Sequence, residues 1–159
     1  MVMMTLGTGI GLAAVVDGRL LHSSHGQATI GGHLTVVVGG RPYTCGNRGC
    51  AEAEASTSVL PELARSDLRF STSALSSFEA IDYSKVFLLA GTDPLCRDLR
   101  DRALAVWSAL AVSLVHAYDP EILIVGEGHR GCGRRPFRSV GRLSRTLRMD
   151  TVGECATSP

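Results

Sequence analysis

The longest regular pattern in this chain lies between residues 94 and 118, and it constrains the fold more than any other feature. Apolar residues recur there at spacings of three and four, as they do on one face of an α-helix. They are Leu95, Leu99, Ala103, Val106, Leu110, Leu114 and Tyr118. Pro94 suits the first turn of such a helix, and Asp93 or Thr92 can cap it. An apolar face of this length must pack on a broad partner such as a β-sheet.

A short apolar segment follows this predicted helix. Residues 119–121 read Asp-Pro-Glu and end the helix, and residues 122–126 read Ile-Leu-Ile-Val-Gly, which is typical of a buried parallel strand. A helix, a tight turn, a buried strand and a glycine in this order predict an α/β fold that binds its ligand at the carboxyl end of the strand. The chain has 159 residues, the length of one domain.

A glycine-rich turn lies near the start of the chain. Residues 6–11 read Leu-Gly-Thr-Gly-Ile-Gly between two apolar runs, 1–6 and 12–16, which we predict to be strands. Such a backbone can close around a phosphate, although a glycine-rich turn between strands is often only a hairpin. An Asp-Gly pair at 17–18 predicts a second hairpin turn into a third strand.

Two thiols and an imidazole form the most informative cluster in the sequence. His33, Cys45 and Cys50 occur within one short glycine-rich segment, and Glu52 follows closely. Thiolate sulfur and imidazole nitrogen are the usual ligands of tetrahedral zinc, so this segment is a candidate zinc site. The alternatives are that Cys45 and Cys50 are ordinary buried thiols, or that His25 serves as a substitute ligand.

The remaining segments predict three further elements and a tail. Residues 34–38 form a β-branched run typical of a strand, and residues 51–65 are rich in alanine, glutamate and leucine, which favours a helix. A polar connection covers 66–77, and residues 78–90 predict another helix. Residues 129–159 contain seven arginines and two acidic residues without a sustained period, so we predict a disordered basic tail.

Composition argues against several classes of function. The formal net charge is only +1, and the arginine-rich tail has one aromatic residue and no apolar helical stripe, so neither nucleic acid nor a membrane is an expected partner. Five cysteines make an odd count without a disulfide pattern, which fits the reduced thiols of a cytoplasmic protein. The apolar start of the chain lacks the basic region of a signal peptide, and no apolar run is long enough to span a bilayer.

Four blocks of sequence together resemble one protein family. They are the glycine-rich turn at 6–11, the hairpin at 16–21, the segment 32–52 and the turn at 119–121. These blocks are similar to the ROK family, which groups bacterial sugar kinases with sugar-responsive repressors. The segment 32–52 is the most specific of them, because it is similar to the family's Gly-His … Cys-x-Cys-Gly-x-x-Gly-Cys-x-Glu signature.

The resemblance implies an actin-like fold, in which two α/β lobes enclose a nucleotide and a sugar. Residues 1–128 are expected to form a single actin-like, ribonuclease H-like lobe, the second of the two, followed by the tail at 129–159. The implied activity is phosphorylation of a hexose or an N-acyl amino sugar by ATP with Mg²⁺. The first lobe's Asp-x-Gly-x-Thr turn and Asn-Asp pair have no counterpart here, so no catalytic base can be named and the lobe alone is expected to be inactive.

The resemblance also implies roles for individual residues. Those expected to bind the nucleotide or its phosphates are Gly7, Thr8, Gly9, Gly11 and Gly126. His33 and Glu52 are expected to contact the sugar. His33, Cys45 and Cys50 are the implied zinc ligands, so that one ring nitrogen of His33 faces the metal and the other faces the sugar.

Three departures from the family pattern bear on these roles. Ile30 stands where the family has a glutamate, and an aliphatic side chain cannot accept a hydrogen bond from a sugar. Tyr43 stands in place of the first zinc cysteine, so the fourth ligand position falls to water or is empty. Glu127 interrupts the glycine run after the last strand and brings a negative charge close to the nucleotide.

Two other interpretations fit the same residues. One is a sugar-sensing regulator without catalysis, which acts through a protein partner. The other is a degraded gene product, in which residues 129–159 come from a shifted reading frame. In either kinase or regulator, a missing first lobe is the expected partner, and without it the uncovered apolar surface favours self-association.

Overall fold

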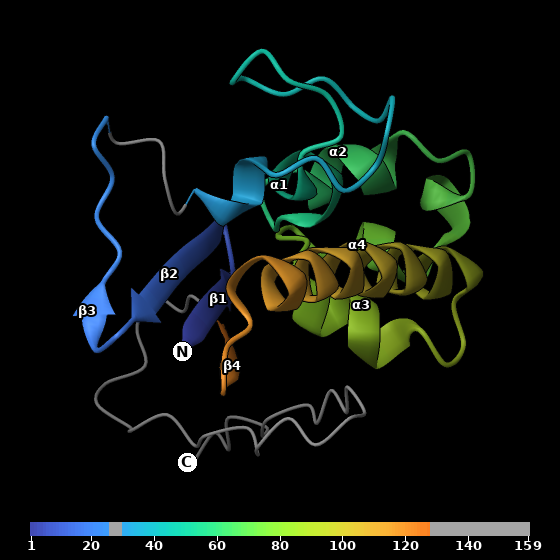
Figure 1. The fold of residues 1–159 in the computed structure, drawn as a ribbon. Helices are drawn as coiled ribbons and strands as arrows, with labels where there is room; N and C mark the ends of the chain where they lie inside the picture. Colours follow the sequence, from blue (N-terminus) through green and yellow to red (C-terminus); the bar gives the residue numbers. More distant parts are fainter. Residues whose placement is uncertain (26–29, 128–159) are drawn as a thin grey trace.

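A four-stranded sheet forms the base of the molecule in the computed structural model, which describes residues 1–25 and 30–127. Its strands are β1 (Val2–Leu6), β2 (Ile10–Val16), β3 (Arg19–Leu20) and β4 (Leu123–Glu127), arranged in the order β3-β2-β1-β4 (Figure 1). β1 pairs antiparallel with β2 and parallel with β4. The predicted α/β class and the parallel pairing of the last strand are therefore confirmed.

Two tight turns connect the first three strands. Leu6 pairs with Ile10, so the glycine-rich segment turns at residues 7–9, where the Gly7 amide donates to the Gly9 carbonyl at 3.0 Å. At the second turn Asp17 and Gly18 both have positive φ, 50° and 73°, as a two-residue hairpin of matching twist requires. Both predicted hairpins are confirmed, and β2 begins two residues earlier than its apolar run suggests.

The long helix α4 spans Pro94–Tyr118, as the apolar periodicity predicts. The Asp93 carboxylate caps it by accepting from the amides of Leu95 at 2.9 Å and Cys96 at 3.2 Å. Asp119, with φ of 40°, ends it in the left-handed conformation. Figure 1 shows α4 crossing the sheet, and its apolar face supplies half of the core between the two layers.

Two hydrophobic clusters share this helix. The first lies between α4 and the sheet and contains Val2, Met4, Ile10, Ala14, Ala51, Ala55, Val106, Trp107, Leu110 and Leu114 among others. The second lies beyond the sheet, where the amino-terminal half of α4 meets α2 (Leu60–Arg65), α3 (Tyr83–Leu89) and the preceding turns; it contains Leu60, Leu75, Val86, Leu95 and Leu99. The helix thus joins the sheet to the helical part of the chain.

The predicted helix over 51–65 is wrong in one respect, because the structure divides it in two. α1 covers Ala51–Ala55 and α2 covers Leu60–Arg65. Between them the amides of Thr57 and Ser58 donate to the Gly7 and Thr8 carbonyls, at 2.9 and 3.3 Å, instead of continuing the helix. The glycine-rich turn therefore interrupts the helix and ties its end to the sheet.

The strand predicted at 34–38 is also wrong. Thr35 alone forms an isolated bridge, to Cys50, and the amides of Val36 and Val37 both donate to the Gly49 carbonyl. Val38 is 97% exposed, so its apolar side chain is not held by any sheet. The β-branched run is part of a loop that folds back on itself.

Smaller corrections concern the later elements. The helix expected over 78–90 begins only at Tyr83, because the Asp82 side chain caps it by accepting from the Lys85 amide at 3.0 Å. In β4 only Leu123 is buried, so this strand lies at the sheet's edge rather than in its interior. The disorder predicted for 129–159 concerns residues outside the described part. Within residues 1–25 and 30–127, no helix has the length and apolar character needed to cross a membrane.

We predict that Asp93→Ala lowers the free energy of unfolding by about 2–3 kcal/mol. Besides capping α4, the buried carboxylate accepts from the Ser73 hydroxyl at 2.6 Å and the Ala74 amide at 2.9 Å. Urea unfolding measures the change. The matched control is Asp98→Ala, which removes an exposed carboxylate paired with Arg69 and should cost less than about 0.5 kcal/mol. Equal losses in the two variants would contradict the prediction.

The same experiment has a pH dependence. Burial opposes ionisation of Asp93, but hydrogen bonds from Ser73 and from the amides of Cys96, Ala74 and Leu95 outweigh it and lower the pKa of the carboxyl group. A lowered pKa stabilises the fold above the ordinary aspartate pKa, and this stabilisation disappears as the pH falls through the lowered value. The difference between wild type and Asp93→Ala should therefore shrink in acid.

Candidate functional site

The carboxyl ends of β1 and β4 meet beside the glycine-rich turn. Thr5 pairs with Gly126 and Leu6 pairs with Glu127, so both β4 residues lie next to residues 7–9. A cavity of about 380 Å³ opens here; it is lined by Thr5, Gly7, Thr8, Gly9, Ile10, Gly11 and Glu52. Of the residues predicted to bind phosphate, Gly7, Thr8, Gly9 and Gly11 line this cavity, whereas Gly126 is beside it through its pairing with Thr5.

Glu52 connects the glycine-rich turn to α1. Its Oε2 accepts from the Ile10 amide at 2.6 Å. A Cβ added at Gly9 would lie 2.6 Å from this oxygen, and one added at Gly32 would lie 2.8 Å from it. A side chain at Gly9 would displace the carboxylate, and one at Gly32 would also lie 2.5 Å from the Ile10 backbone oxygen. The glycines at these positions therefore allow the Glu52 carboxylate to approach the backbone, in addition to forming the glycine-rich turn.

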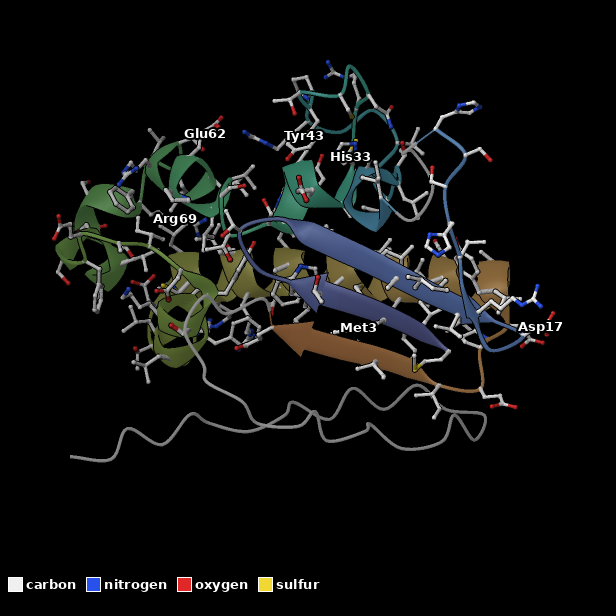
Figure 2. All side chains as sticks on the ribbon, turned by 90° about the vertical axis from the view of Figure 1, so that its left-hand side faces the viewer. Met3, Asp17, His33, Tyr43, Glu62 and Arg69 are labelled. Atoms are coloured by element: carbon white, nitrogen blue, oxygen red, sulfur yellow. The ribbon has the colours of Figure 1, made fainter. Side chains whose placement is uncertain are left out.

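His33 and Tyr43 lie on the other side of the same carboxylate. The Tyr43 hydroxyl donates to Oε1 of Glu52, and Nε2 of His33 is 4.0 Å from that oxygen. The two rings meet edge to face, with centroids 5.5 Å apart, and Figure 2 shows both side chains above the sheet. The two predicted sugar contacts are thus brought together. Tyr43 as a partner of Glu52 was missed, because at the sequence level it reads only as a lost metal ligand.

This environment changes the acidity of Tyr43. Burial raises the pKa of Tyr43 to about 12, and the hydrogen bond to Glu52 and the negative charge of that carboxylate act in the same direction. The raised pKa keeps the hydroxyl protonated above the ordinary value of 10.0 as well, so Tyr43 remains a hydrogen-bond donor to Glu52 up to about pH 12.

The two thiols of the same loop are close to each other. The sulfur atoms of Cys45 and Cys50 are 3.6 Å apart, and two thiolates on one tetrahedral zinc, each at about 2.3 Å, lie about 3.8 Å apart. Burial raises the pKa of Cys50, which opposes the thiolate form that zinc requires. Across residues 1–25 and 30–127, no three histidine, cysteine, aspartate or glutamate side chains are grouped so as to hold a metal. The pair fits half of a zinc site, and the full set with His33 stays a prediction.

The segment that carries Glu52 is fastened to α4 by contacts that the sequence did not indicate. Arg102 forms an ion pair with the buried Glu54 side chain, and its Nε donates to the Glu54 carbonyl at 3.2 Å. The indole nitrogen of Trp107 donates to the Ala55 carbonyl at 3.0 Å. These bonds satisfy the carbonyl end of α1 and fix the orientation in which Glu52 faces the cavity.

Comparison with known proteins links this site to a family. The model of the ROK family matches residues 1–151. The glucokinase of Halalkalibacterium halodurans is 35% identical over 138 residues, which are 80% of this chain and 41% of that protein. N-acetylmannosamine kinase of Vibrio cholerae is 29% identical over 80% of the chain and 42% of its own length. The DNA-binding transcriptional repressor Mlc of Escherichia coli is 27% identical over 74% of the chain and 29% of its own length.

Solved structures give the same result for the fold. The ROK hexokinase from Thermus thermophilus matches with a TM-score of 0.64 and 33% identity, over 80% of this chain and 40% of that one. The ROK family glucokinase from Streptomyces griseus, solved with glucose and AMPPNP, matches with a TM-score of 0.63 and 27% identity, over 80% and 44%. The predicted actin-like lobe is confirmed, and the chain spans less than half the length of these relatives.

We predict that the Tyr43–Glu52 bond gives stability a specific alkaline dependence. A raised tyrosine pKa stabilises the fold below the ordinary value of 10.0, and the stabilisation is lost as the pH rises through about 12. The unfolding free energy of the wild type should therefore fall more steeply over this interval than that of Tyr43→Phe. Tyr118→Phe, at the last residue of α4, is the control for removal of a tyrosine hydroxyl outside the site. Parallel curves for wild type and Tyr43→Phe would contradict the prediction.

Proposed function

The chain belongs to the ROK family, and we propose that it forms the sugar- and phosphate-binding part of an ATP-dependent sugar kinase. The observation that carries this proposal is the position of Glu52. One of its oxygens contacts the glycine-rich turn through the Ile10 amide, and the other faces His33 and Tyr43. A single carboxylate thus links the predicted phosphate site to the predicted sugar site.

The proposed chemistry follows from this arrangement. A sugar hydroxyl is a donor and an acceptor, and the Glu52 carboxylate and the His33 imidazole supply the complementary groups about 4 Å apart. The turn at residues 7–9 then receives the terminal phosphate of the nucleotide, whose charge Mg²⁺ neutralises when bound. Phosphoryl transfer depends mainly on holding the two substrates in line, so the short path between the two subsites is what the reaction needs.

The sugar class is proposed from the relatives. Their names specify glucose and N-acetylmannosamine, and the solved glucokinase contains glucose and AMPPNP. We infer that a hexose or an N-acyl amino sugar is the ligand, and that the nucleotide is ATP with Mg²⁺. Ile30 offers the sugar no acceptor, and Glu127 opposes the nucleotide's charge beside the turn, so both affinities should be lower than in an intact kinase.

The proposal has three further parts. Zinc would be held by His33, Cys45 and Cys50, and the spacing of the two sulfur atoms supports this; when bound, zinc would orient the imidazole. The lobe is proposed to end at residue 128, although the family match continues to 151. A cytoplasmic location fits the reduced thiols, because all three described cysteines are free.

A second candidate function is sugar sensing without catalysis. The similarity to the repressor Mlc supports it, and so does the cavity itself. Glu52 is the only carboxylate that lines the cavity among the described residues. Each of its oxygens accepts one hydrogen bond and keeps a second lone pair for a sugar hydroxyl, so it suits sugar binding, and the described lining holds no second carboxylate to act as the base. A regulator would need the sugar site but no base. In this alternative the regulator acts through a protein partner.

We predict that the purified chain shows no sugar-dependent ATP turnover with glucose or N-acetylmannosamine, because the described part of the cleft supplies no base. A coupled ADP-release assay measures this, with an intact ROK glucokinase as the positive control. Saturable turnover would contradict the prediction. Calorimetric titration of the same samples separates the two functions: sugar binding strengthened by Mg·AMPPNP supports the kinase lobe, and sugar binding indifferent to the nucleotide supports the sensor.

A mixing experiment tests the proposed partner. If the chain is half of a cleft, a separately expressed first lobe should restore turnover, and without it the chain should self-associate through its uncovered apolar surface. Exposed apolar side chains on the described residues include Leu20, Val38, Leu68 and Leu88. Sedimentation velocity measures the association, and a monodisperse monomer at high concentration would count against the missing-lobe interpretation.

A further inference from the structure

Glu54 is a buried acidic residue for which the proposed function has no role. It lies two residues after Glu52 in α1, and only 1% of its surface is exposed. A carboxylate in such a position is costly unless it is paired and hydrogen bonded. Its partners therefore indicate what the residue does.

Glu54 has two kinds of partner, which come from different parts of the chain. The guanidinium of Arg102, on α4, forms an ion pair with one carboxylate oxygen. The other oxygen accepts from the backbone amide of Arg41 at 2.6 Å. Arg41 lies at the base of the loop that contains Tyr43 and Cys45, so one buried carboxylate ties this loop to the longest helix of the fold.

The loop is built around that attachment point. The Gly49 amide donates to the Arg41 carbonyl at 2.8 Å, and the Tyr43 amide donates to the Asn47 carbonyl at 2.9 Å. A Cβ added at Gly40 would collide with the Glu54 carboxylate, so the backbone approaches as closely as the chain permits. The position of Tyr43 thus depends on where Glu54 holds residue 41.

We propose that Glu54, ion-paired to Arg102, is a positioning residue that holds the loop 40–49 so that Tyr43 meets Glu52 at the sugar site. This inference rests on the proposed function for its effect on sugar binding, but not for its effect on the loop. Glu52 and Glu54 then divide the work of α1: one faces the ligand cavity, and the other fixes the loop that completes it.

The proposal predicts a local effect. Glu54→Gln keeps an oxygen that can accept from the Arg41 amide but removes the negative charge that pairs with Arg102. Arg102→Gln breaks the same ion pair by removing its positive charge, which lies on the more exposed side chain. Both variants should speed hydrogen exchange at the amides of Arg41 and Gly49 by about tenfold or more, while exchange of the β1 amides stays unchanged. A general loss of stability would instead accelerate both regions together.

The matched control uses the second carboxylate on Arg41. The Arg41 guanidinium pairs with the exposed Glu62 carboxylate at 2.5 Å. Glu62→Gln therefore removes the negative charge that pairs with Arg41 and leaves the Arg41 backbone amide unaltered. Figure 2 shows Glu62 well away from the His33–Tyr43 pair. Glu62→Gln should leave both the loop exchange and sugar affinity as in the wild type.

Glucose titration by calorimetry completes the test. With wild-type protein that binds glucose, Glu54→Gln and Arg102→Gln should weaken the affinity at least about fivefold, in step with the faster loop exchange. If wild-type protein binds no sugar, the proposed function fails, and the exchange data still decide the role of Glu54. Unchanged loop exchange in both variants, or equal acceleration in β1, overturns the inference. If Arg102→Gln does not fold because it leaves the Glu54 carboxylate buried without its charge partner, Glu54→Gln decides alone, since the 41% exposed Arg102 side chain can be solvated.

Discussion

The carboxylate of Glu52 is the interaction on which the site depends. It accepts from the Ile10 amide at the edge of the sheet and from the Tyr43 hydroxyl in the loop, and it lies close to His33. Three segments that are far apart in the sequence therefore converge on one side chain. Because an ionised acceptor forms stronger hydrogen bonds than a neutral one, the convergence also defines the geometry of both subsites.

The orientation of Glu52 is in turn a property of α4. This helix buries one face against the sheet and continues into a second cluster, so it packs in both parts of the hydrophobic core. Arg102 and Trp107 extend from it to the carbonyl end of α1. The long helix α4 thus holds the five-residue helix α1 and the glycine-rich loop in position. Neither of these could hold its conformation alone.

The sequence predicted the elements whose patterns are long or steric. The period of α4, the cap at Asp93 and the hairpin at Asp17 all follow from local rules, and the structure agrees. It failed where tertiary hydrogen bonds compete with propensity. Val38 belongs to a strand-like run but has no strand to pair with, and the helix after Ala55 ends because the glycine-rich turn offers other acceptors.

The candidate site shows the same difference between features that the sequence predicts and features that depend on tertiary contacts. The family resemblance implied that His33 and Glu52 both contact the sugar, whereas nothing in the sequence indicated the bond from Tyr43 or the buried Glu54–Arg102 pair. Both depend on how residues 40–49 fold back, which no period in the sequence encodes. The zinc ligand set stays a prediction because only the two sulfur atoms are placed as one metal requires.

The most direct test of the central claim is an NMR titration of the chain with glucose, followed at the Ile10 amide and the His33 imidazole. If Glu52 joins the sugar and phosphate subsites, both signals should shift saturably with one affinity, and addition of Mg·AMPPNP should move the Ile10 signal further. If glucose shifts neither signal, or shifts His33 while Ile10 stays fixed at saturation, Glu52 does not link the two subsites.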